Sequence, residues 1–224
     1  MLINADFDKR VVVHAAEIPW TPSPASGVER KMLDRVGGEV ARATSIVRYA
    51  PGSSFPAHTH DGGEEFLVLD GVFQDEFGDY PSGSYVRNPP TSRHTPRSEP
   101  GCVIFVKLHQ FELSDRTQVR MAPAQMTAVA RTEGREATVI PLYENAFERV
   151  RIEQWRAGAA VSFSAPHGLE ALVLEGDFEE GGSTFSQHSW LRLPPGSLFE
   201  AISGHWGTKV WIKTGHLRNI RQPV

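Results

Sequence analysis

Two histidines that are two positions apart, His58 and His60, precede a turn sequence and a carboxylate. Alternate side chains of an extended strand point to the same face, so these imidazoles are expected to project together. The turn sequence Asp61-Gly62-Gly63 contains glycines that tolerate positive φ, which lets the next strand start at Glu64 beside the histidines. Because imidazole and carboxylate groups are common ligands of divalent transition metals, the stretch predicts a metal site.

The spacing around these residues makes the prediction more specific. Five residues separate Gly52 from His58, and six separate Glu64 from Gly71. The pattern Gly-x5-His-x-His-x3-Glu-x6-Gly resembles the first signature of the cupin superfamily. A solvated polar turn is the competing interpretation of His-Thr-His, and the wider spacing disfavours it.

A fourth ligand is expected downstream. In the second cupin signature, a Pro-x-Gly turn is followed three residues later by a metal-binding histidine. Here the turn Pro81-Ser82-Gly83 is present, but Val86 occupies the histidine position. His94 is the nearest histidine downstream, and we assign it as the fourth ligand. The predicted metal ligands are therefore His58, His60, Glu64 and His94.

The position of His94, downstream of the usual histidine position, indicates a particular group of cupins. Over residues 18–110 the sequence is similar to the cupin domain of ChrR-type anti-sigma factors and of related stand-alone cupins. The motifs that carry this similarity are His58-Thr59-His60, Glu64-Glu65, Gly83-Ser84-Tyr85, Arg87-Asn88-Pro89-Pro90 and His94-Thr95-Pro96. The resemblance implies a jelly-roll β-barrel that holds one divalent transition metal ion. Zinc is favoured, and iron, manganese and nickel are alternatives.

The cysteine content separates the chain from a complete ChrR-type regulator. Such regulators also carry an N-terminal helical zinc domain with paired cysteines, which grips the sigma factor. This chain has one cysteine, Cys102, so the sigma-binding half is expected to be missing. A single cysteine also excludes an intramolecular disulfide, which fits a reducing cytoplasm. Cys102 precedes an apolar run and is expected to be a small buried side chain.

The composition favours an all-β fold. The 224 residues include 20 glycines and 16 prolines, and short apolar runs such as 66–69 and 103–106 lie between turn residues. A net charge of −4 with scattered basic residues gives no reason to expect a nucleic-acid or membrane partner. Residues 1–20 have neither a secretory nor a membrane-spanning pattern.

An internal repeat divides the chain. With an offset of 105 residues, residues 65–92 align with residues 170–197 without a gap. The aligned pairs include Glu65 with Glu170, Leu67 with Leu172, Gly71 with Gly176, Arg87 with Arg192 and Pro89 with Pro194. We therefore expect a tandem cupin, a bicupin of two RmlC-like double-stranded β-helix (jelly-roll) barrels. The predicted domains are residues 1–118, which hold the metal site, and residues 119–224.

The repeat predicts different chemistry in the two barrels. The positions that match the four proposed ligands are all apolar, so the second barrel is expected to lack a metal. These positions are Phe163, Ala165, Leu169 and Phe199. Glu65 persists as Glu170, which indicates a structural role, whereas Glu64 is lost together with the histidines and is the better ligand. Nearby His167 is interpreted as a turn residue rather than a relic ligand.

Two classes of function stay open. The first is a regulatory or small-ligand-sensing protein similar to ChrR, with a sigma factor or another protein as partner. The second is a metal-dependent dioxygenase that uses Fe(II) and acts on a small diketone or aromatic ketone, like some related stand-alone cupins. One carboxylate ligand would leave a net positive charge at a divalent ion, so a small anionic ligand is expected in the N-terminal barrel. Association into a homo-oligomer is a further candidate interaction.

Overall fold

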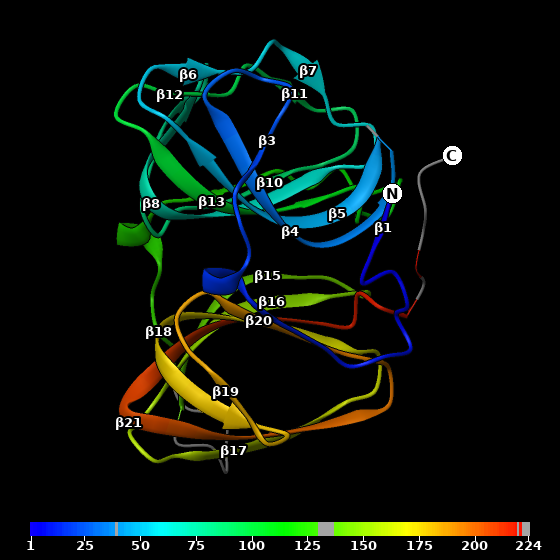
Figure 1. Ribbon diagram of the computed structural model, residues 1–224, viewed down its shortest axis with the longest axis vertical. Helices are drawn as coiled ribbons and strands as arrows, with labels where there is room; N and C mark the ends of the chain where they lie inside the picture. Colours follow the sequence, from blue (N-terminus) through cyan, green and yellow to red (C-terminus); the bar gives the residue numbers. More distant parts are fainter. Residues whose placement is uncertain (39, 130–136, 219, 221–224) are drawn as a thin grey trace. The chain divides into compact units, whose positions relative to one another are not determined.

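The protein is built almost entirely from β-strands, as Figure 1 shows for a computed structural model that describes residues 1–38, 40–129, 137–218 and 220. Within these residues the helices are two 3-10 turns, η1 (Ala15–Glu17) and η2 (Pro123–Gln125). The predicted all-β fold class is therefore confirmed. No helix in the described ranges is long and apolar enough to cross a membrane.

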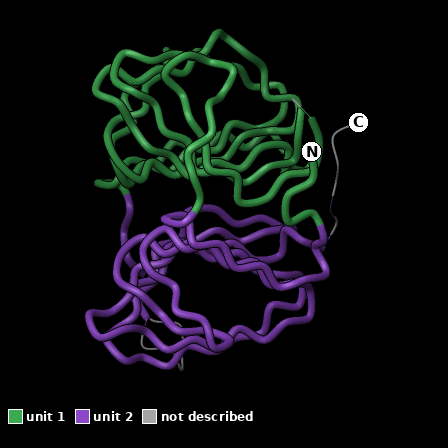
Figure 2. The backbone as a smooth tube through the Cα atoms, viewed as in Figure 1, with its two compact units in different colours: residues 1–5, 18–125, 221–224 green, residues 6–17, 126–220 purple. Residues whose placement is uncertain are grey.

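Two compact units make up the described chain (Figure 2). The first unit contains residues 1–5 and 18–125, and the second contains residues 6–17 and the described residues from 126 to 220. This grouping by packing differs from the sequence domains 1–118 and 119–224, which stay a prediction. Residues 130–136, near the start of the second predicted domain, lie outside the described residues.

The first unit is organised around one large antiparallel sheet with the strand order β1-β4-β5-β13-β8-β10-β14. A separate two-stranded ladder joins β7 to β11. The strands of this unit are β1 (Leu2–Ile3), β3 (Thr21–Pro22), β4 (Val28–Gly37), β5 (Ala41–Tyr49), β6 (Ser53–Ser54), β7 (His58–Thr59), β8 (Glu64–Asp75), β9 (Gly78–Pro81), β10 (Tyr85–Asn88), β11 (Arg93–His94), β12 (Arg97–Ser98), β13 (Cys102–Leu108) and β14 (Val119–Met121).

The second unit repeats the central order of the first, with β15-β16-β21-β18-β20-β2 as its main path. In addition, β17 pairs with β21 and β19 pairs with β18. Its strands are β2 (Val11–His14), β15 (Ala137–Glu144), β16 (Arg149–Trp155), β17 (Ala160–Ala165), β18 (Leu169–Glu180), β19 (Ser183–Phe185), β20 (Ser189–Leu193) and β21 (Ser197–Thr214).

Each unit contains one strand that comes from the other half of the sequence. Strand β2, from the start of the chain, pairs with β20 and places Val12 opposite Leu191. Strand β14, which follows the first barrel, pairs with β10 and places Arg120 opposite Val86. Leu191 and Val86 occupy matching positions in the sequence repeat. The two units therefore receive their added strands along matching strands, β10 and β20.

Matching strand pairs also share their register. In the first unit Glu65 of β8 lies opposite Lys107 of β13, and in the second Glu170 of β18 lies opposite Lys213 of β21. All four side chains are buried. The repeated sequence positions thus have equivalent structural positions.

Two of the repeated glycines have a steric reason to be glycine. Gly71 has a φ of 71° and Gly176 a φ of 72°, in the left-handed region that side chains other than glycine rarely adopt. A Cβ atom at either position would collide with a carbonyl oxygen, that of Gly101 or of Gly207 respectively. Each glycine therefore lets two strands approach closely.

Cys102 lies in the apolar core of the first unit, as predicted. Its side chain is buried at the start of β13, and burial raises the pKa of the thiol to about 11. At pH 8 roughly one thiol in a thousand would be ionised. We expect a thiol reagent such as Ellman's reagent to modify Cys102 only after unfolding, and absorbance at 412 nm measures this. Rapid labelling of the folded protein would show that the buried position is wrong.

Candidate metal centre

Short segments of the first unit bring the predicted ligands together. His58 lies in β7 and His94 in β11, and the antiparallel pairing of these strands places the two residues opposite each other. His60 follows β7, and its backbone is hydrogen-bonded to the loop before β11. Glu64 is the first residue of β8, as predicted, because Gly63 adopts a φ of 77° in the preceding turn.

The side chains of these four residues converge on one point. One ligand atom from each residue lies within 4.8 Å of the others. His60 Nε2 is 3.2 Å from His58 Nε2 and 3.5 Å from Glu64 Oε2, and His94 Nε2 is also 3.5 Å from Glu64 Oε2. Among the residues that the structure describes, this is the only such group of three or more His, Cys, Asp or Glu side chains. The group could hold a metal ion.

The opposite ring nitrogen of each histidine, Nδ1, is hydrogen-bonded away from the cluster. The partners are Pro56 O for His58 at 3.0 Å, Ser92 Oγ for His60 at 3.1 Å and Asp75 Oδ2 for His94 at 3.3 Å. Carbonyl and carboxylate oxygens accept, so Nδ1 of His58 and of His94 carries the proton. The rings of His58 and His94 then present the lone pair of Nε2 to the cluster, as metal-bound histidines do.

Burial and neighbouring charges favour the metal-binding forms of Glu64 and His60, but not that of His94. Burial by itself would raise the pKa of Glu64, but His60 and His94 outweigh it and hold that pKa below its usual value. Burial lowers the pKa of His60, although Glu64 opposes this. Burial also acts to lower the pKa of His94, but the hydrogen bond to Asp75 and the negative charges of Glu64 and Asp75 together outweigh burial and raise that pKa. Near neutral pH the site therefore offers an anionic carboxylate, and a metal ion competes with a proton at His94.

One buried atom indicates that the cluster is suited to a metal. His94 Nε2 has no hydrogen-bond partner among the described residues, even though the side chain is almost fully buried, with only 2 % of it exposed. A buried polar atom without a partner is costly, and a metal ion coordinated by Nε2 would remove that cost. His60 and Glu64 are also buried, whereas His58 is exposed. The donor set thus fits a divalent transition metal, and its open side lies at His58.

Asp75 is a residue that the sequence did not single out. It lies at the end of β8 and accepts hydrogen bonds from His94 Nδ1, Tyr80 Oη and Phe77 N. Outer partners of this kind orient the ligand and raise its basicity. We expect Asp75→Asn to weaken metal binding by about 10- to 100-fold, measured by competition with a chelator. Asp70→Asn, at an exposed position of the same strand, is the matched control, and equal affinities in both variants would contradict the role of Asp75.

The position of the usual cupin histidine is filled by core packing. Val86 is fully buried in the apolar cluster of the first unit, so nothing at that position reaches the four ligand atoms. In the second unit, the positions that match the ligands also pack in an apolar core. Phe199, Leu169 and Ala165 belong to that core, and Phe163 packs against it.

The second glutamate of the motif has the structural partners expected for it. Glu65 accepts hydrogen bonds from Tyr85 Oη at 2.8 Å and from Arg87 NH1 at 3.4 Å, and it points away from the cluster. Glu170, its counterpart, accepts hydrogen bonds from Trp190 and from His216. Asn88 is a further residue that sequence reasoning missed as part of the site, since its amide donates to Glu64 Oε2 at 2.9 Å.

Comparison with known families gives a match for the first part of the chain. Residues 8–112 match the family model described as the ChrR cupin-like domain. A search of curated proteins found no match.

Solved structures match nearly the whole chain at low sequence identity. A protein from Nostoc punctiforme described as a "putative dioxygenase" has 13% identity and a TM-score of 0.78, over 95% of this chain and 85% of that one. The Escherichia coli protein YlbA has 12% identity and a TM-score of 0.71, over 96% and 94%. An oxalate decarboxylase from Lactobacillus farciminis has 9% identity and a TM-score of 0.64, over 91% and 85%. At these identities the similarity concerns the fold alone.

Proposed function

Because this chain is a member of the cupin superfamily, we propose that its first barrel is a metal centre that binds a small anionic ligand in a regulatory or sensing role of the ChrR kind. The observation that carries the proposal is the convergence of three imidazole nitrogens and one carboxylate oxygen within 4.8 Å. The hydrogen bonds behind each ring support it, because they fix the orientation of the donors before a metal arrives.

The residues of this site would each have a defined task. His60, Glu64 and His94 would hold the ion from the buried side, and His58 from the exposed side. Asn88 and Asp75 would keep Glu64 and His94 in place through the hydrogen bonds described above. A bound divalent ion would supply attraction for an anionic oxygen donor, since Glu64 neutralises only one of its two charges.

Metal analysis tests the proposal directly. Protein purified without added metal is expected to contain about one divalent transition metal ion per chain, with zinc predominant. Inductively coupled plasma mass spectrometry gives both the identity and the amount. Absence of any transition metal, together with no uptake of added zinc, would refute the metal centre.

A regulatory role requires a protein partner, and a sigma factor is the candidate that the ChrR cupin-like match favours. A sigma-factor partner would place the chain in the cytoplasm, in keeping with its single cysteine. Co-purification of the tagged full chain with a sigma factor, lost after metal chelation, would support this role. If no sigma factor binds at micromolar concentration with or without metal, the proposed regulatory role is refuted. The proposed metal centre is not affected by that result.

A metal-dependent dioxygenase is the second candidate. The exposed His58 favours it, because solvent and small substrates could approach the metal from that side. The fold similarity to a protein described as a "putative dioxygenase" extends over 95% of this chain. Oxygen consumption by the Fe(II)-loaded protein with a panel of β-diketones and aromatic ketones tests this candidate. Predominant zinc and no oxygen uptake with any substrate would count against it.

A further inference from the structure

A pocket lies in the second unit, at the end of its barrel that corresponds to the metal-binding end of the first. The pocket has a volume of about 570 Å³, which is in the range of small-molecule sites. Its walls come from β15, β16, the segment 163–168 and the segment 214–218. Residues 163–168 match residues 58–63, the segment of the two metal-binding histidines, in the sequence repeat.

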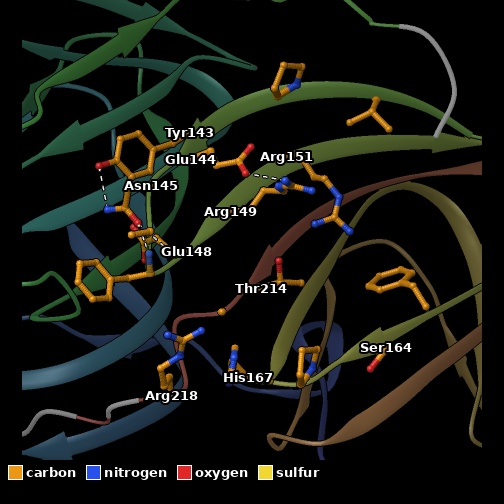
Figure 3. Close-up of a pocket in the computed structure, with 18 residues that line it drawn as sticks. Tyr143, Glu144, Asn145, Glu148, Arg149, Arg151, Ser164, His167, Thr214 and Arg218 are labelled. Carbon is orange, nitrogen blue, oxygen red and sulfur yellow. Dashed lines mark hydrogen bonds and ion pairs between the residues drawn. The ribbon is translucent and has the colours of Figure 1, made fainter.

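Arginine side chains line this pocket, whereas the matching end of the first barrel is lined by the proposed metal ligands. Arg149 and Arg151 of β16 lie on one side, and His167 and Arg218 lie across from them, as Figure 3 shows. Arg151 is buried, whereas Arg218 is exposed. Within the described residues, the Arg218 guanidinium forms no ion pair with a carboxylate.

The acidic residues of the wall do not cancel this charge. Glu144 is paired with Arg149, and Glu148 is paired with Lys213 at 2.8 Å. Arg151 uses its Nε atom to bind Glu153, which lies deeper in the barrel, at 2.6 Å. Each carboxylate thus already has a cation, and Arg218 adds a positive charge beyond these pairs. The wall has a net preference for an anion.

The rest of the wall is suited to an apolar, planar group. The guanidinium carbon of Arg151 lies 5.3 Å from the centre of the Phe163 ring. Val139, Pro141 and Pro166 add further apolar surface. Arginine recognises the two oxygens of a carboxylate with its fork of N–H donors, and aromatic side chains stack on flat ligands.

We propose that this pocket binds a small organic carboxylate with a planar apolar body, and that it does so without a metal. The loss of all four ligand positions in this barrel removed one way of attracting an anion, and the arginines of the pocket supply another. The site is separate from the metal centre, so the proposal does not depend on the function proposed for the first barrel.

Benzoate is a suitable probe, with the uncharged benzamide as its matched control. Isothermal titration calorimetry would be performed on the full chain before and after treatment with a chelator, so that a metal in the first barrel cannot account for binding. We expect benzoate to bind in both states and benzamide to bind at least about tenfold more weakly. No benzoate binding at about 10 mM, equal binding of benzamide, or loss of binding after chelation would each overturn the proposal.

Two arginine variants test whether benzoate binds in this pocket. Arg218→Met is expected to weaken benzoate binding at least about tenfold, and Arg151→Met at least as much. Arg151 also binds buried Glu153, so its replacement can unfold the barrel, whereas the exposed Arg218 carries no such risk. Arg156→Met is the matched control, because Arg156 is exposed in the same unit outside this pocket. Unchanged affinity in Arg218→Met, or equal weakening in Arg156→Met, would show that the pocket is not the site.

Discussion

His94→Ala is expected to remove the metal from the first barrel, lowering its content from about one ion per chain to less than about one tenth. His94 is the most buried of the four proposed ligands, and its Nε2 atom points at Glu64 with no hydrogen-bond partner in the described chain. Its removal leaves three donors, of which His58 is exposed. Mass spectrometric metal analysis after dialysis against a weak chelator measures the effect.

The metal is also expected to contribute to the stability of the first unit. A ligand that binds only the folded state stabilises it by about 2.7 kcal/mol at a free concentration 100 times its dissociation constant. Calorimetric scans should therefore show a transition that rises with added metal in the natural protein and not in His94→Ala. His205→Ala, at an exposed position of the second unit, is the control and should retain its metal. Full metal occupancy in His94→Ala would make the ligand assignment wrong.

The ligand cluster could be predicted because its members are close in sequence or carry a familiar motif. His58, His60 and Glu64 lie within seven consecutive residues, and the chain between them is long enough only for a turn. The strand that carries His58 is shorter than expected, and β7 pairs with β11 rather than with β8. The histidines still converge, because that ladder places His94 opposite His58.

Residues that support the cluster could not be predicted in the same way. Asp75 is 19 positions from His94 and belongs to no motif, so only the folded β8 shows that its carboxylate reaches the ring. Similarly, the apolar run at 11–13 is compatible with a strand, but nothing near it in the sequence reveals that β2 pairs with β20 of the second unit. Local patterns determine that a strand forms, whereas its partner depends on the packing of the whole chain.

The exposed position of Trp206 shows the same limit. Trp190, Trp206 and Trp211 are all large apolar residues in the strand-rich sequence of the second unit. Trp190 and Trp211 are buried, but Trp206 is 87% exposed beside His205, between the two halves of β21. A tryptophan in a strand pattern does not reveal by itself whether its side chain will face the core or the solvent.

The buried ion pairs of the first unit are where a single substitution should cost the most stability. Arg87 contacts Glu65 at 3.4 Å and Asp115 at 3.1 Å, with side-chain exposures of 0%, 2% and 7%. Its guanidinium carbon also lies 4.1 Å from the centre of the Phe111 ring. Removing one partner of a buried ion pair leaves the opposite charge in a medium that solvates it poorly.

Arg87→Met is expected to destabilise the first unit by about 3–5 kcal/mol, because two buried carboxylates would lose the guanidinium that they share. Hydrogen exchange of the β8 amides reports the opening of this unit, and the β18 amides of the second unit provide an internal reference. Arg48→Met is the matched control, since the Arg48–Glu29 pair is 44% and 40% exposed and should contribute less than about 1 kcal/mol. Adding Glu65→Gln to Arg87→Met should restore part of the lost stability, because one uncompensated charge is removed. If Arg87→Met and Arg48→Met had the same effect, burial would not be what makes the Arg87 cluster important to stability.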